Sequence, residues 1–108
     1  MVDYITVDDL MDIASIDGDY NTNRVTAWRY AGIATIENAT GYSLADDKKN
    51  TDADKQRFVN VANIYLQEYA RSNYLAPNYP TTILPELLSR IKLIADDLTK
   101  KQEEESNA

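Results

Sequence analysis

The apolar residues of this chain recur every three to four positions along three long stretches, and this period limits the fold more than any other feature. Near the C-terminus the apolar positions are Leu87, Leu88, Ile91, Ile94, Ala95 and Leu98. A central stretch repeats the spacing with Phe58, Ala62, Tyr65, Leu66 and Tyr69, and an earlier one with Val25, Trp28, Gly32, Ile36 and Ala39. Such spacing places the apolar side chains on one face of an α-helix. The chain is therefore predicted to be all-α.

A capping signal marks the first helix. Thr6 is followed three positions later by Asp9, which resembles a capping box with Asp in place of Glu. This signal predicts a short helix over Val7–Ala14.

Start and stop signals also bound the second helix. Asn21 or Thr22 can cap it at the N-terminus. Gly41 stands where a left-handed C-cap belongs, so the helix is expected to end at about Thr40.

The remaining boundaries complete a bundle of about four helices, one short, two long and one C-terminal. Thr51 or Asp52 would cap a third helix from Ala53 to about Asn73, and Pro85 suits the first turn of a fourth. Residues 1–100 are expected to form one small helical domain. Residues 101–108 are expected to be an acidic flexible tail, because apolar periodicity is lost there.

A polar stretch separates the second and third helices. It reads SLADDKKNTDADK, over Ser43–Lys55, with mixed charges and no periodicity. A long mobile loop is predicted here, and loops of this length in small domains tend to be disordered or to reach a partner.

Composition excludes several function classes. The chain has 18 acidic and 11 basic residues and a formal charge of -7, the wrong sign for gripping a phosphate backbone. It has no Cys and no His, so disulfides, thiolate zinc sites and His-dependent triads are excluded. No apolar run approaches the roughly 18 residues of a membrane span, and no positive segment opens the chain as in a signal peptide. A soluble intracellular protein without membrane association is expected.

One stretch, IDGDYNTNR, resembles the start of a calcium loop, because four oxygen-bearing side chains alternate along it: Asp17, Asp19, Asn21 and Asn23. The sixth position, however, is Thr22 and the twelfth is Trp28, where a calcium loop has Gly and Glu. The stretch is interpreted as an acidic turn between two helices. No metal site and no cofactor are expected.

Carboxylates are the remaining candidates for catalysis. Glu37 and Glu68 are single acids on the two long helices, each next to the apolar stripe, and both are expected to face solvent or form a salt bridge. We therefore predict no catalytic residue and no enzyme activity.

Aromatic usage suggests contacts with partners. The chain has eight Tyr and one Phe, and Tyr suits surfaces that are half buried and half wet. The candidate interface residues are Trp28, Tyr30, Tyr42, Tyr74 and Tyr79, with the loop residues Asp46, Asp47, Lys48, Lys49 and Asn50. The same aromatics could instead complete the core of the subunit.

Three stretches together resemble the tailed-phage head-tail connector family. VDDLMDIASIDGDYNTNRVTAWRYAGIATIENATGY is similar to the family's opening pattern: a short helix, an acid-rich Ile-Asp turn, and a long helix ending in a Tyr-Ile-Glu-like and Thr-Gly sequence, here ATIENATGY. FVNVANIYLQEYARSNY resembles its Tyr-rich central helix, and ILPELLSRIKLI its closing segment. The family often carries a more charged second helix than RVTAWRYAGIATI, and its last helix usually ends earlier.

The resemblance implies a structural virion protein of a bacteriophage. Such a head-completion or adaptor protein assembles as a ring beneath the portal protein, extends the DNA channel and offers a docking surface for a stopper or tail protein. The implied location is the head-tail interface, after assembly in the host cytoplasm. Double-stranded DNA would pass through without specific binding, since an acidic ring suppresses phosphate contacts.

The charge also fits a different class of protein. A small acidic helical interaction protein, such as a regulator, an inhibitor or a DNA mimic, would use its carboxylates to cover a basic surface.

Overall fold

The computed structural model describes residues 2–75 and 82–106, with side chains as far as Lys100. Within these ranges it contains four α-helices, α1 (Val7–Ile13), α2 (Thr22–Thr40), α3 (Asp52–Leu75) and α4 (Ile83–Ser106). A 3₁₀ turn over Asp19–Asn21 precedes α2. The predicted all-α class, with one short helix and a polar loop between the second and third helices, is confirmed.

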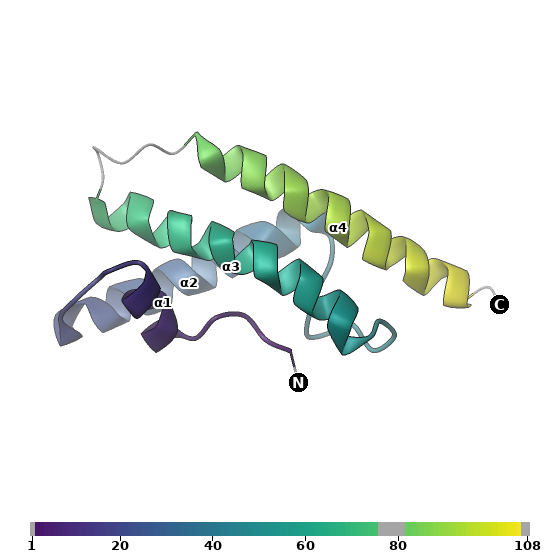
Figure 1. The fold of residues 1–108 in the computed structure, drawn as a ribbon, viewed down its shortest axis with the longest axis horizontal. Coiled ribbons are helices and arrows are strands. Elements are labelled where there is room, and N and C mark those ends of the chain that lie inside the picture. The colour runs from purple at the N-terminus through teal and green to yellow at the C-terminus, as the bar shows by residue number, and fades with distance from the viewer. Residues whose placement is uncertain (1, 76–81, 107–108) are drawn as a thin grey trace.

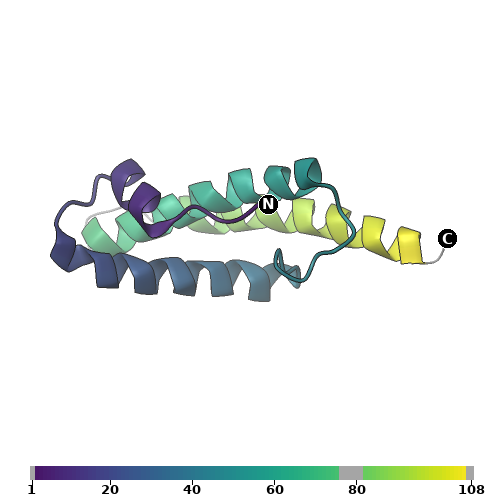
Figure 2. The ribbon, with the colours of Figure 1, turned by 90° about the horizontal axis from the view of Figure 1, so that it is seen from below.

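The three long helices lie lengthwise and form an elongated body of 51 × 28 × 18 Å (Figure 1). Successive long helices run in opposite directions, so α2 and α4 point the same way (Figure 2). α2 packs against both α3 and α4, and α1 packs across α2 and α3 near the 3₁₀ turn. The architecture is a three-helix bundle with one short helix laid on its side.

The core is centred on Phe58 of α3, which is fully buried. Tyr42 packs edge-on against it with ring centroids 4.7 Å apart, and Tyr4 does so at 6.4 Å. The apolar stripes predicted for α3 and α4 are buried or half-buried throughout. On α2 the prediction is wrong for Ala39, which is exposed, because Tyr42 and Leu44 fill the core at that end.

The predicted cap of α1 is confirmed. The Thr6 hydroxyl accepts a hydrogen bond from the Asp9 backbone N–H at 3.2 Å. At the other end, Arg71 of α3 donates to the Ile13 carbonyl at 2.9 Å. A guanidinium at a helix C-terminus satisfies an orphan carbonyl and favours the helix dipole. This cation therefore fixes the short helix on the bundle.

Asn21 occupies the N-cap position of α2, but its side chain does not cap the helix. It is buried, 1% exposed, and its amide donates to the Asp17 carbonyl at 2.6 Å. The 3₁₀ turn leads directly into α2, so the Asn21 backbone is already helical and its side chain is turned toward the preceding loop. The stretch is thus a turn held by its own hydrogen bonds, as predicted.

The other helix ends follow the sequence closely. Gly41 is left-handed with φ 69°, as expected for a C-cap. The Thr51 hydroxyl accepts from the Asp54 N–H at 3.2 Å, which confirms Thr51 as the cap of α3. The helix of α4 continues to Ser106, beyond the expected boundary at residue 100. Flexibility of the tail stays a prediction.

Gly32 allows α2 to approach α3 closely. A Cβ atom on Gly32 would lie 2.6 Å from a methyl group of Leu66 and 3.5 Å from the Tyr69 ring. Leu66 is itself buried, so its side chain has little room to move away. A side chain at this position would therefore require Leu66 to shift at the helix crossing.

Replacing Gly32 with Leu is expected to lower the free energy of unfolding by about 1–3 kcal/mol, because the added side chain overpacks the crossing. The matched control is Ala39→Leu, at an exposed position two turns further along the same helix, which should change stability little. Urea unfolding followed by circular dichroism measures both variants. Equal midpoints for the two would show that α2 and α3 do not approach as described.

Candidate functional site

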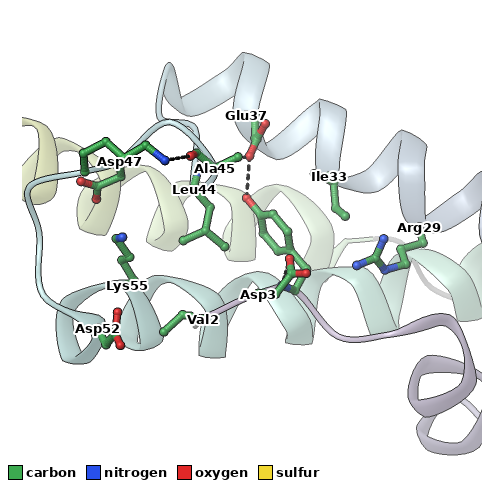
Figure 3. A pocket seen from close by; sticks show the side chains of 12 residues that line it. Val2, Asp3, Arg29, Ile33, Glu37, Leu44, Ala45, Asp47, Asp52 and Lys55 are labelled. Atoms are coloured by element: carbon green, nitrogen blue, oxygen red, sulfur yellow. Dashed lines mark hydrogen bonds between the residues drawn. The ribbon is translucent and has the colours of Figure 1, made fainter.

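A half-open pocket of about 680 Å³ lies beside the end of α2 (Figure 3). Its walls are the N-terminal segment Val2–Tyr4, the inward side of α2, the α2–α3 loop and the first turn of α3. Val2, Ile33 and Leu44 supply apolar surface, and the remaining lining is mostly charged. Clefts of this volume are the usual size for small ligands.

Glu37 joins two parts of the chain at this pocket. Its carboxylate accepts from the Tyr4 hydroxyl at 2.8 Å and from the Leu44 backbone N–H at 3.4 Å (Figure 3). Burial raises the pKa of Tyr4, and the hydrogen bond to Glu37 raises it further. The prediction that Glu37 faces solvent or a salt bridge is therefore wrong, whereas Glu68 does pair with Arg71 at 3.5 Å.

Asp47 holds the α2–α3 loop together. Its carboxylate accepts from the Tyr42 hydroxyl, from the backbone N–H groups of Lys49 and Asn50, both at 3.0 Å, and from the Asn50 side chain at 2.9 Å. Burial alone would raise the pKa of Asp47, but these hydrogen bonds outweigh it and hold the pKa below its ordinary range. Burial and the bond to Asp47 raise the pKa of Tyr42.

The loop is consequently pinned to the body, which corrects the expectation of a mobile segment. Tyr42 and Asp47 were predicted to contact a partner. Each is 4% exposed, so neither side chain is available for such a contact. The Asn50 amide also donates to the Leu98 carbonyl of α4 at 3.3 Å. Of the predicted loop contacts, Asp46, Lys48 and Lys49 are exposed.

The N-terminal segment is fixed by its own set of bonds. The Ile5 N–H donates to the Asn63 side chain at 2.9 Å, and Arg29 Nε donates to the Ile5 carbonyl at 2.5 Å. Arg29 is thereby turned toward the pocket rather than toward the outer side of α2 (Figure 3).

Two of the acidic residues that line the pocket, Glu37 and Asp47, have a structural role. Glu37 and Asp47 are acceptors that tie the N-terminal segment and the loop to α2, while Lys48 and Lys55 stand at the rim. Among residues 2–75 and 82–100, no three carboxylates gather as a possible metal site. The arrangement can order the chain and can bind a ligand of mixed polarity.

The predicted aromatic contact residues do not form one surface. Trp28 is half-buried, with the Arg24 guanidinium 5.2 Å above its ring, and Tyr30 is 78% exposed on the outward side of α2. Tyr74 is partly exposed near the end of α3, distant along that helix from the loop. Tyr79 lies outside the described residues.

A carboxylate-free surface on α2, which we term the α2 outer face, was not anticipated. Its exposed or half-buried members are Asn23, Arg24, Thr26, Ala27, Tyr30, Ala31, Ala34, Thr35 and Asn38. In a chain of charge -7 this face carries one cation and no acid. Tyr20, 81% exposed, adjoins it. The available signal was the absence of Asp and Glu between Tyr20 and Ile36.

Leu93 was also missed. It is 72% exposed on the outward side of α4, away from the buried stripe. Its signal in the sequence is an apolar residue at a position that the helical period assigns to solvent.

No helix in the described part of the chain has both the length and the apolar character needed to cross a membrane.

Asp47→Asn is expected to destabilise the fold by about 1.5–3 kcal/mol at neutral pH, because an amide cannot accept from every donor that the carboxylate serves. The matched control is Asp46→Asn, since Asp46 is exposed. Because the pKa of Asp47 is lowered in the folded chain, its carboxylate stabilises the fold above the unfolded pKa of about 4. This stabilisation is lost as pH falls. The difference between wild type and Asp47→Asn should therefore shrink in acid, as measured by thermal unfolding. A constant difference down to low pH would exclude this role.

Raised tyrosine pKa values predict sensitivity to alkali. Tyr4 and Tyr42 stay protonated in the folded chain above pH ~10, whereas the unfolded chain releases those protons. The contribution of these two phenols to the free energy of unfolding should be constant below that pH and fall as pH rises above it. Tyr4→Phe should reduce the slope of this fall, and Tyr20→Phe, at an exposed site, should not. Identical slopes for Tyr4→Phe and Tyr20→Phe would show that the Tyr4 phenol does not have a raised pKa in the folded chain.

Comparisons with protein-family models, curated proteins and solved structures find no match for this chain.

Proposed function

We propose that the protein is a structural virion component of a tailed phage, a head-tail connector that assembles as a ring beneath the portal and gives a stopper or tail protein its docking surface. The three stretches that resemble the connector family form α1 to α4 in the order which that resemblance implies. The proposal assigns the chain a role in assembly rather than in catalysis.

The observation that carries the proposal is the α2 outer face. Surfaces of small soluble proteins are rich in Lys and Glu, yet this face spans α2 without a carboxylate and displays Tyr30. Loss of charge and exposure of Tyr are features of protein interfaces. A copy of charge -7 can approach this side with less repulsion than the acidic sides.

The acidic residues suit the second part of the proposed role, which is to line a channel through which DNA passes. Six carboxylates on the first nineteen residues are exposed, at Asp3, Asp8, Asp9, Asp12, Asp17 and Asp19. In a ring such groups would repel the phosphates of passing DNA and discourage binding.

The same acidic cluster favours the second candidate, a small acidic protein that covers a basic surface on a regulator or enzyme. The two functions differ in which surface is essential. The connector depends on uncharged contacts, and the alternative depends on the carboxylates.

Co-purification with the portal protein encoded in the same genome tests the proposal. The chain is expected to be retained by tagged portal and to add a ring-shaped layer in electron micrographs. A variant with Asp8, Asp9 and Asp12 changed to Asn should still be retained, since the uncharged contacts remain. Failure of the wild-type chain to bind portal would refute the connector, and loss of all binding in the Asn variant would favour the alternative.

A further inference from the structure

The α2 outer face has the geometry of a socket for a helix of another protein. Ala27, Tyr30, Ala31 and Ala34 stand at positions i, i+3, i+4 and i+7. Four residues at this spacing form the hole that receives one side chain of a facing helix. Three of the four are alanines, which let a second backbone come close.

A matching knob is present on the same chain. Leu93 projects from the outward side of α4 and is the most exposed aliphatic side chain among the described residues. Near Leu93 on α4, Arg90 pairs with Glu86 at 3.0 Å and Asp97 pairs with Arg57 at 2.9 Å, whereas Lys92 and Asp96 are exposed. Leu93 is exposed within its own copy, so it does not pack on α2 of that copy.

We infer that Leu93 of one copy inserts into the hole formed by Ala27, Tyr30, Ala31 and Ala34 of the next copy. This inference rests on the proposed function and names the subunit contact of the ring. The contact is heterologous, since each copy uses α4 on one side and α2 on the other. Contacts of this kind generate closed rings or open filaments.

The direction and register follow from charge. Arg24 lies six to seven residues before the centre of the hole, about 10 Å along α2, and Glu86 lies seven residues before Leu93, about 10 Å along α4. Parallel packing therefore sets Arg24 of one copy against Glu86 of the other, which would exchange its exposed partner Arg90 for Arg24. At the opposite end it sets Asn38 against Lys100, which avoids like charges.

Parallel packing is also what a ring whose axis runs along the bundle requires. α2 and α4 point the same way within one copy (Figure 2). Rotation about an axis that runs along the bundle leaves helix directions unchanged, so α2 of one copy and α4 of the next remain parallel. The charges and the symmetry of such a ring therefore both favour parallel packing of α2 and α4.

Disulfide trapping tests the contact cleanly because the chain has no natural Cys. Ala31→Cys and a size-tagged Leu93→Cys are mixed at high concentration and oxidised. The mixed dimer is expected to be the main cross-linked product. The control mixes Ala31→Cys with tagged Asn60→Cys, an exposed site on α3, and should give no preference for the mixed dimer.

Charge exchange tests the register. Arg24→Glu in the first partner should slow formation of the mixed dimer about two- to fivefold, and Glu86→Arg in the second should restore it, as for an exposed ion pair. A mixed dimer no more abundant than in the control would overturn the inference. If the mixed disulfide dimer forms but portal does not retain the chain, the contact between copies is supported and the connector function is refuted. If portal retains the chain but the mixed dimer does not form, the connector function is supported and this contact is refuted.

Discussion

The close approach of α2 to α3 at Gly32 determines how the rest of the molecule is used. With no side chain at Gly32, Leu66 and Tyr69 of α3 pack directly on α2. The inner side of α2 is thereby committed to the bundle, together with Val25 and Ile36. The α2 outer face, on the opposite side, has no role in the core. Folding alone therefore does not explain why this face lacks carboxylates.

Two buried acceptors complete the fold at the other end of α2. Glu37 binds the N-terminal segment through Tyr4, and Asp47 closes the following loop through Tyr42 and Asn50. Both phenols pack on Phe58, so the polar ties and the apolar core stabilise the same region. Aromatic residues that looked available for partners, Tyr42 above all, are used here within the subunit.

Helical period and caps were sufficient to predict the architecture, because Thr6, Gly41 and Thr51 act locally. The loop was mispredicted because its order depends on contacts that composition does not report, such as Asn50 with the Leu98 carbonyl. The exposed side chains on which the proposed contact rests were only partly predicted. Tyr30 was identified from its residue type, whereas Leu93 required knowing which side of α4 faces outward.

These features support the proposal that this chain of charge -7 contacts its own neighbour through the carboxylate-free α2 outer face. Electron cryomicroscopy of the assembled ring, at a resolution that shows side chains, measures this most directly. Leu93 of each copy is expected to lie among Ala27, Tyr30, Ala31 and Ala34 of the next, with α4 parallel to the neighbouring α2. A ring in which the α2 outer face is exposed to solvent or to DNA would contradict it.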